Sequence, residues 1–297
     1  MKKKQQDEAL RYFKEHAEDW KSKAESSGYD RVNIIQQRND YVLKVIKNRF
    51  KTEYVLDVGC GTGDLVCDIA KKGIDAIGVD YAQEMIKLST QKAKGSKLNG
   101  AHFECCSIFD FDFSRRKYDV ISANGFIEYI SPEELRKFFD LVVDALAPQG
   151  SFVVGSRNRL FNILSINNYT LQELEEPDFN LLLKEAISLA SGTSIEEFVK
   201  MTCAELQKPD TKHEKTGIDV TTRFQYTPIQ LIQMLSKRGF RPVEIYPIHI
   251  HGVPPVFKNK RPEVHTSISN LLQSYAEHNP ELVLFSSSFM LHAQKAD

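Results

Sequence analysis

Three glycines in a short turn, with carboxylates before and after it, carry the clearest chemical signal in the sequence. The stretch reads Tyr54-Val-Leu-Asp57-Val-Gly59-Cys60-Gly61-Thr-Gly63, and Asp80 follows seventeen residues after the last glycine. Glycine lets a backbone approach a ligand closely where a Cβ atom would obstruct it. An apolar strand, a glycine turn, a helix and a second strand that ends in a carboxylate together indicate the front half of a nucleotide-cofactor site.

The spacing of the glycines indicates which kind of cofactor this is. A dinucleotide fold uses GxGxxG and holds a pyrophosphate at the helix N-terminus, whereas this turn is GxGxG and Asp64 comes next. Carboxylates at Asp57 and Asp64 would repel a pyrophosphate but would suit a cation, such as the ammonium of an amino acid. Asp80 can accept hydrogen bonds from both hydroxyls of a ribose. A nucleoside with an amino-acid cation and no phosphate describes S-adenosylmethionine.

Length, composition and charge argue against several function classes. The chain has 297 residues, 41% of them hydrophobic and 27% charged, and a formal net charge of −1. This balance argues against a nucleic-acid partner, which usually brings a basic excess. No apolar stretch is long enough to span a bilayer, and no apolar run follows the basic start as in a signal peptide. Five cysteines without a CxxC pair indicate neither a disulfide framework nor a zinc site, so we expect a cytoplasmic protein without a membrane partner.

The order of apolar and polar residues predicts the elements that hold this turn. Strands are expected at 53–58, 75–80, 101–106, 118–124 and 150–156, and helices at 5–25, 30–50, 64–72, 82–94 and 132–147. Most inner strands are apolar throughout, as expected when both faces of a parallel sheet are covered. Ser131, Pro132 and Glu134 predict a sharp helix start with a capping box. The alternation predicts an α/β protein with a doubly wound, mostly parallel sheet.

We divide the chain into four parts on these patterns. They are an N-terminal helical segment (1–50), a cofactor-binding core (51–156), a helical cap or substrate insertion (157–226) and the C-terminal part of the core sheet (227–297). The third part breaks the rhythm of strands and helices, with helical patterns at 181–190 and 195–206 and then a polar stretch. The fourth resumes it with a helix capped by Thr227, strands at 241–250 and 282–294, and a helix between them.

The chain resembles the class I S-adenosylmethionine-dependent methyltransferases over roughly residues 5–156 and 227–294. Its pattern is closest to the ubiquinone-biosynthesis O-methyltransferase type. Phe13, Ala17 and Trp20 look like the opening of that group, and Ser156-Arg157-Asn158-Arg159 looks like the ending of its fifth strand. The resemblance implies a seven-stranded, Rossmann-like methyltransferase fold with N-terminal helices and a helical cap insertion.

The resemblance also implies a set of cofactor-binding residues. The loop from Gly59 to Gly63 would lie against the methionine portion of the cofactor, and Asp80 would bind its ribose. Asn124, at the tip of the fourth strand, would lie beside the cofactor through its backbone. The full set is Arg38, Asp57, Gly59, Cys60, Gly61, Gly63, Asp80, Tyr81, Met85, Ser107, Ile108 and Asn124.

Arg38 and Ser107 are the two members of this set for which the sequence offers an alternative. Arg38 matches an arginine that reaches the carboxylate of the cofactor, and a guanidinium suits a carboxylate bidentately, although a solvated arginine on a helix face is an equal alternative. Many family members bind the adenine amino group with an Asp after the third strand, where this chain has Ser107. A serine hydroxyl can accept that hydrogen bond, and Asp110 would serve instead if the alignment slips.

Glu128, His249 and His251 are the candidates for handling the methyl acceptor. Methyl transfer from a sulfonium is an in-line displacement, and an acceptor hydroxyl or ammonium must also lose a proton. The two histidines lie two apart near a strand end and would share a face, so one could act as a general base. They could also be two metal ligands, but no third ligand is evident and no metal site is predicted. The simpler alternatives are a structural and a surface histidine, and an exposed carboxylate at a helix start.

These observations predict an S-adenosylmethionine-dependent methyltransferase that acts on a small-molecule substrate, with O-methylation favoured. The fourth strand ends in Asn124-Gly-Phe, not in the (Asn/Asp)-Pro-Pro-(Tyr/Phe) motif of enzymes that methylate nucleobase or amide nitrogens. Three alternatives stay open: N- or C-methylation of a small metabolite, a cofactor-binding protein without methyl transfer, and a nicotinamide dehydrogenase. The dehydrogenase would need a glycine where Asp64 stands. A homodimer is compatible with the sequence.

Overall fold

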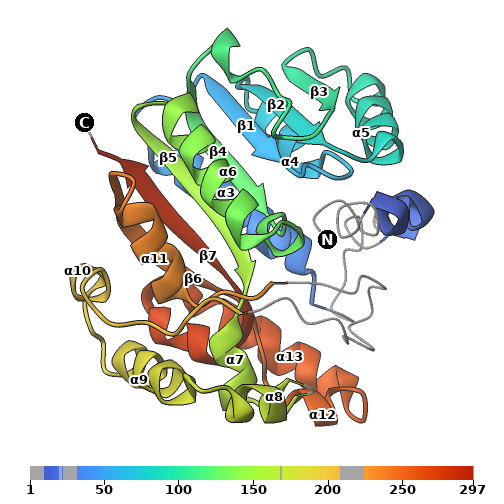
Figure 1. Cartoon of the computed structure of the whole chain (residues 1–297). Helices are drawn as coiled ribbons and strands as arrows, with labels where there is room; N and C mark the ends of the chain where they lie inside the picture. The colour runs from blue at the N-terminus through green and yellow to red at the C-terminus, as the bar shows by residue number, and fades with distance from the viewer. Residues whose placement is uncertain (1–9, 20–21, 23–31, 168, 208–223, 297) are drawn as a thin grey trace.

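A seven-stranded sheet forms the centre of the computed structural model, which describes residues 10–19, 22, 32–167, 169–207 and 224–296 (Figure 1). The strand order is β3-β2-β1-β4-β5-β7-β6. The strands are β1 (Tyr54–Val58), β2 (Asp75–Asp80), β3 (Ala101–Cys105), β4 (Tyr118–Asn124), β5 (Leu146–Arg157), β6 (Phe240–Ile250) and β7 (Ser286–Lys295). The first five are parallel to one another, whereas β7 is antiparallel to both β5 and β6. The predicted mostly parallel, doubly wound sheet is confirmed.

Helices cover both faces of the sheet, which explains why its inner strands are apolar throughout. On one face lie α3 (Ile34–Asn48) and α4 (Asp64–Ala70), and on the other lie α6 (Pro132–Ala145) and α11 (Pro228–Ser236). Val153 of β5 belongs to the core under the first pair, and its neighbour Val154 belongs to the core under the second. Successive residues of a strand point to opposite faces, so each must be apolar when both faces are buried.

Capping boxes begin α6 and α11, as the sequence predicts. The Ser131 hydroxyl accepts a hydrogen bond from the Glu134 N–H at 3.2 Å, and the Glu134 carboxylate accepts one from the Ser131 N–H at 2.8 Å. Thr227 and Gln230 exchange the same pair of bonds at the start of α11. Each box satisfies backbone donors that have no partner inside the helix.

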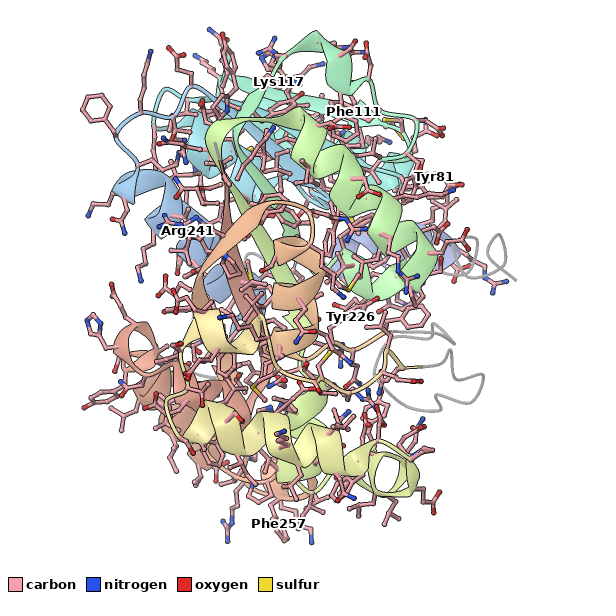
Figure 2. All side chains as sticks on the ribbon, turned by 60° about the vertical axis from the view of Figure 1, so that its left-hand side comes forward. Tyr81, Phe111, Lys117, Tyr226, Arg241 and Phe257 are labelled. Atoms are coloured by element: carbon pink, nitrogen blue, oxygen red, sulfur yellow. The ribbon has the colours of Figure 1, made fainter. Side chains whose placement is uncertain are left out.

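The helices after β5 and β6 gather at one end of the sheet, the lower end in Figure 1. They are α7 (Arg159–Leu164), α8 (Thr170–Glu175), α9 (Phe179–Ala190), α12 (Pro255–Lys258) and α13 (Pro262–Gln273). Phe257 of α12 lies at the opposite end of the molecule from Lys117, which begins the turn into β4 (Figure 2). Because α7 follows β5 directly, the carboxyl end of the parallel sheet faces this group of helices.

Two predicted elements are shorter in the structure than the sequence suggests. The helix expected to run to residue 206 is α10 (Ile195–Phe198), because the carbonyls that follow accept hydrogen bonds from side chains of α11 instead. Gln230 binds the carbonyls of residues 204 and 205, and Gln233 binds those of residues 198 and 201. The last strand begins at Ser286, since Pro280–Phe285 forms a 3-10 helix.

The N-terminal helical pattern is described in part. Residues 10–15 and 17–19 are helical, as predicted, and Trp20 lies outside the described residues. A further helix, α5 (Gln83–Gly95), follows β2 close to its predicted bounds. Among the described helices, none combines the length and the apolar character that a membrane crossing requires.

Candidate active site

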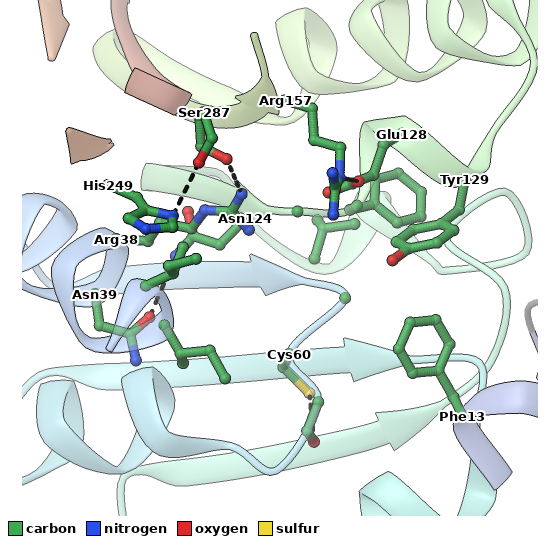
Figure 3. Close-up of a pocket in the computed structure, with 18 of the residues that line it drawn as sticks. Phe13, Arg38, Asn39, Cys60, Asn124, Glu128, Tyr129, Arg157, His249 and Ser287 are labelled. Carbon is green, nitrogen blue, oxygen red and sulfur yellow. Dashed lines mark hydrogen bonds and ion pairs between the residues drawn. The ribbon is translucent and has the colours of Figure 1, made fainter. Parts of the chain in front are cut away.

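Every predicted site residue except Gly63 lines one cavity of about 890 Å³. It runs from the glycine turn after β1, past the tips of β2 and β4, to the helices beyond the sheet. Figure 3 shows Glu128, Arg157 and His249 on one side of this cavity, with Cys60 of the glycine turn across from them. Ligands of parallel α/β sheets bind beyond the carboxyl ends of the strands, where this cavity lies. We call the end near the glycine turn the cofactor end, and the end near His249 the acceptor end.

At the cofactor end, the glycine turn is anchored to β2 and presents bare backbone to the cavity. The N–H groups of Gly59 and Cys60 both donate to the carbonyl of Val79, at 2.8 and 3.1 Å. Gly61 has a φ of +51°, and no atom lies within 4 Å of where its Cβ would stand. The space beside Gly61 therefore belongs to the cavity, and a ligand can approach the backbone there.

Gly63 has a packing role that the sequence does not reveal. It does not line the cavity, and a Cβ at this position would lie 2.5 Å from the Cβ of Ser89 and 2.7 Å from the ring of Phe103. The third glycine thus allows α4 to begin against α5 and β3. These contacts with the protein support a packing role for Gly63, and its contact with the cofactor stays a prediction.

Asp80 and Asp57 place two carboxyl groups on the cavity wall, of which Asp57 is buried and Asp80 is partly exposed. The two oxygens of Asp80 accept hydrogen bonds from the N–H groups of Gly61 and Ala82, at 3.0 and 2.8 Å. Each oxygen keeps a second lone pair, which suits a pair of ribose hydroxyls. Asp57 accepts a hydrogen bond from Ser122 at 2.6 Å, and burial raises its pKa to about 7. A cationic ligand beside Asp57 would favour its ionised form.

Asp64, which the sequence suggests as a partner for a cation of the ligand, already has a cation of its own. Its carboxylate accepts hydrogen bonds from Lys92 and from the Thr62 hydroxyl, both at 2.5 Å. This pairing weakens the case for Asp64 as a ligand contact and leaves Asp57 as the stronger candidate.

The residues expected around the adenine lie at the rim and wall of the cofactor end. Ser107 and Ile108 line the cavity, whereas the alternative residue Asp110 is exposed and does not line it. Met85 is buried, and Tyr81 is 47% exposed at the rim (Figure 2). The structure therefore favours Ser107 over Asp110 for the adenine contact.

Between the two ends, Asn124 and Arg38 approach each other across the tip of β4. The Arg38 guanidinium donates to Ser288 of β7 at 2.9 Å. A Cβ on Gly125 would stand 2.4 Å from this guanidinium, so glycine is required here for Arg38 to enter the cavity. Asn124 donates to Asn39, and its own Oδ1 is buried with no hydrogen-bond partner among the described residues. An unsatisfied buried acceptor in this position suits a donor from a bound ligand.

At the acceptor end, Glu128 is a buried carboxylate with a cationic partner. Its side chain is 3% exposed and accepts a hydrogen bond from the Arg157 Nε at 2.8 Å. The simpler interpretation of an exposed helix-start carboxylate is therefore wrong. Phe13, from the N-terminal helix, packs edge-to-face on Tyr129 beside this pair, with ring centroids 5.3 Å apart. The pairing with Arg157 makes Glu128 better suited to positioning than to proton transfer.

The imidazoles of His249, in β6, and of His251, directly after that strand, lie together as the sequence predicts, with ring centroids 4.3 Å apart, and a third histidine joins them. His265 of α13 has its Nε2 3.2 Å from the Nε2 of His249. The sequence shows no third candidate ligand, so His265 corrects that part of the interpretation. Burial holds the pKa of all three imidazoles below the usual value, to about 3 for His251. Such a low pKa weakens the hypothesis that His251 acts as a general base near neutral pH.

Sequence reasoning misses Gly125, directly after the predicted Asn124, and it misses Ser287, Ser288 and His265, which join the site from distant segments. Ser287 and Ser288 belong to β7, and the Ser287 hydroxyl lies 2.9 Å from the Nδ1 of His249. These residues follow no local motif. Only the pairing of β6 with β7, and the packing of α13 on β6, brings them to the cavity.

Comparison with known proteins identifies the domain that contains the glycine turn. Residues 55–150 match the family model described as "Methyltransferase domain". A carboxy-S-adenosyl-L-methionine synthase from Nitratiruptor sp. is 28% identical over 116 residues, which is 38% of this chain and 47% of that protein. A ubiquinone biosynthesis O-methyltransferase from Coxiella burnetii is 28% identical over 179 residues, which is 60% of this chain and 71% of that protein. The match thus spans about half the length of the first of these relatives.

A solved structure shows the same fold over nearly the whole chain. It is magnesium protoporphyrin IX methyltransferase from Synechocystis PCC 6803 with bound S-adenosylmethionine, at a TM-score of 0.56 and 14% identity. The comparison covers 97% of this chain and 95% of that one. The strand order, the cavity at the carboxyl ends of the strands and the matching domain agree with the resemblance seen in the sequence. The chain therefore contains a methyltransferase domain of the S-adenosylmethionine-dependent type, in a Rossmann-like methyltransferase fold.

Proposed function

We propose that the protein transfers a methyl group from S-adenosylmethionine to a small-molecule acceptor, and that the acceptor atom is an oxygen. One observation carries this proposal: a single cavity joins the glycine turn and Asp80 to the group formed by Glu128, Arg157 and the histidines. At about 890 Å³, it falls within the usual size range for sites that enclose small ligands.

The residues of each end have separate tasks in this proposal. At the cofactor end, Gly61 offers bare backbone, Asp80 accepts the ribose hydroxyls and Asp57 faces the ammonium. Bound S-adenosylmethionine supplies the electrophilic methyl group. At the acceptor end, the acceptor oxygen forms the new bond to the methyl carbon, and the sulfur–carbon bond breaks with its electron pair left on sulfur. The hydroxyl proton departs to solvent.

The acceptor end also supports a polar acceptor. Arg157, Lys258, His249 and His251 line it, together with the side chains of Asn162 and Gln225. Asn162 donates to the carbonyl oxygen of the Gln225 side chain at 2.7 Å, which fixes both amides in place. Oriented amides and cations suit a ligand with hydroxyl or carboxylate groups. A relative is named as an O-methyltransferase of ubiquinone biosynthesis, which is consistent with oxygen as the acceptor atom.

Binding and turnover can be measured separately. We expect calorimetry to show binding of S-adenosylmethionine and S-adenosylhomocysteine, with no binding of NAD. Release of S-adenosylhomocysteine would then be followed against pools of phenols, sugars and carboxylic acids. Acceptor-dependent release that yields a methyl ether or ester supports the proposal. Methylation only on nitrogen or carbon would overturn the choice of oxygen, and cofactor binding without turnover on any pool would indicate a binding protein.

A further inference from the structure

Three imidazoles meet at the acceptor end of the cavity. They belong to His249 of β6, to His251 directly after that strand and to His265 of α13, and one nitrogen from each lies within 4.8 Å of the others. The closest pair of nitrogens, Nε2 of His249 and Nε2 of His265, is 3.2 Å apart. His249 and His251 line the cavity, while His265 closes the cluster from behind.

The backbone around His249 orients its imidazole toward the other two histidines. His249 has a φ of +56°, which is rare for a residue with a side chain and costs on the order of 1–3 kcal/mol. Its N–H leaves the β-ladder and donates to the side-chain oxygens of Gln37 and Gln273, at 2.9 and 3.2 Å. Ser287 holds the Nδ1 of His249 at 2.9 Å, so its Nε2 is the nitrogen that faces the other two histidines.

Close packing of α13 on β6 brings His265 into the cluster. The Ser269 hydroxyl donates to the carbonyl of Ile250 at 2.5 Å, one helical turn after His265. A Cβ on Gly252 would stand 2.4 Å from the Cβ of Ile268, so the chain just after His251 must be glycine for the helix to approach this far. Both features shorten the distance between the strand and the helix.

The imidazole nitrogens lack partners that would explain their burial. The Nδ1 of His265 is buried without a hydrogen-bond partner among the described residues, and the two ring nitrogens of His251 make no well-formed hydrogen bond there, their one electrostatic backbone neighbour being Val253. Leaving a buried polar group unsatisfied costs about 1–3 kcal/mol, so an arrangement with several such atoms calls for a ligand. Burial keeps the pKa of these rings low, and neutral imidazole is the form that binds metal ions.

We propose that His249, His251 and His265 bind a divalent transition-metal ion of the zinc type. With metal–nitrogen distances of about 2.0–2.1 Å, neighbouring ligands in a tetrahedron are about 3.4 Å apart, close to the His249–His265 separation. The nitrogens of the three rings lie within 4.8 Å of one another, so His251 must move closer to complete the set. Ser287 supplies the hydrogen bond that ligating histidines usually make through their second nitrogen. Three protein ligands leave a fourth position that faces the cavity, the arrangement of a catalytic site.

The ion's role rests on the proposed function, whereas its binding does not. A metal ion in this place would hold the acceptor oxygen, lower the pKa of its hydroxyl and leave an oxyanion for methyl transfer. Lys258, which also lines the cavity, places a positive charge near all three histidines and so disfavours an added dication. An anionic oxygen as the fourth ligand would offset that repulsion.

The test is metal binding by the full chain without a polyhistidine tag, after treatment with a chelator. We expect calorimetry to find one Zn²⁺ per chain and Co²⁺ to give a visible absorption band that Zn²⁺ displaces. His265→Ala should weaken Zn²⁺ binding at least tenfold and abolish the Co²⁺ band. The matched control is His292→Ala, a histidine of β7 that bonds Ser151 outside the cluster and should bind Zn²⁺ like the unaltered protein.

Thermal melting provides a second measurement and a check on folding. Zn²⁺ should raise the melting temperature of the unaltered chain and of His292→Ala, but not of His265→Ala or His251→Ala. No stoichiometric binding by the unaltered chain, or equal affinity in His265→Ala, would overturn the metal site. Because these readouts need neither cofactor nor acceptor, their failure is distinct from a failure of methyl transfer.

Discussion

The two ends of the cavity are built in opposite ways. The cofactor end comes from one short run of sequence, since Asp57, Gly61 and Asp80 lie on two neighbouring strands and the turn between them. The acceptor end gathers Glu128, His251 and His265 from segments that only the folded sheet brings together. A continuous run can be recognised from its residues, whereas an assembled group depends on strand pairing and helix packing. Substitutions at the cofactor end should therefore act on affinity, and those at the acceptor end on turnover.

The largest effect on stability is expected from a substitution at the third glycine of the turn. Gly63→Ala forces a Cβ to within 2.5 Å of Ser89 at a φ of +75°. Overpacking and left-handed strain together should cost about 3 kcal/mol in the free energy of unfolding. Chemical denaturation measures this cost.

The matched variant is Gly61→Ala, where the φ is also positive but the Cβ meets open space. We expect a loss of about 1 kcal/mol in stability and a roughly tenfold weaker affinity for S-adenosylhomocysteine. Equal loss of stability in the two variants would show that Gly63 has no special packing role.

At the acceptor end, His251→Ala should lower turnover about a hundredfold, because it removes a ligand of the proposed metal ion that would hold the acceptor oxygen. The dissociation constant of S-adenosylhomocysteine should stay the same, because His251 lies away from the glycine turn. Steady-state kinetics with an acceptor found in the screen, together with calorimetry, measure both quantities. A weaker cofactor affinity with normal turnover would reverse the comparison, and His292→Ala is the control.

Asp80→Ala should weaken cofactor binding by about 2 kcal/mol, close to thirtyfold, since charge-assisted hydrogen bonds to the ribose are lost. Asp80→Asn keeps one side-chain acceptor for the N–H of Gly61 or Ala82 and should lose less. Calorimetry measures both variants. Unchanged affinity in Asp80→Ala would reject the ribose assignment.

The pH dependence of stability and of cofactor affinity should identify the contribution of Asp57 at the cofactor end. Its pKa is raised from 3.8 to about 7, so the folded chain holds this proton between those values while the unfolded chain has lost it. Stability from this group is therefore lost as pH rises through that range, and it levels off above pH 7. A cationic ligand needs the ionised form, so cofactor affinity should rise about fivefold between pH 6 and about 7.

Asp57→Asn removes the titrating proton and should flatten this part of the profile. Calorimetry in buffers of different ionisation enthalpy should also detect proton release when the cofactor binds to the unaltered chain. A profile with the same slope in Asp57→Asn would assign the dependence to another group.

The smallest expected effect distinguishes the two adenine candidates. Ser107→Ala should weaken cofactor binding by about 1 kcal/mol, the usual value of a neutral hydrogen bond. Asp110→Ala should leave it unchanged, because Asp110 is exposed and does not line the cavity. The opposite result would show that Asp110, and not Ser107, binds the adenine.

Features that depend on local spacing could be predicted from the sequence, whereas features that depend on distant contacts could not. The sheet, the capping boxes at Ser131 and Thr227 and the glycine turn were predictable, since each depends on local spacing. The role of Gly63 was not, because the clash that a side chain would make involves Ser89 and Phe103 from other elements.

The acceptor end was predictable only where it follows a strand period, which placed His249 and His251 on one face. His265 could not be found, because it lies in a helix whose packing on β6 depends on Ser269 and on the glycine at position 252. Likewise, α10 ends early because glutamine side chains of α11 bind the carbonyls that follow it. Such long-range partners leave no pattern in a single sequence.

The position of β7 between β5 and β6 has a consequence for how the protein forms during synthesis. When β6 leaves the ribosome, the strand that pairs with it among the described strands, β7, has not yet been made. The strands of the cofactor end can pair much earlier. Pairings of distant segments form slowly, so the last strand should complete the sheet and, in the same step, bring Ser287 to His249. The growing chain would then form the cofactor end of the cavity before the acceptor end is complete.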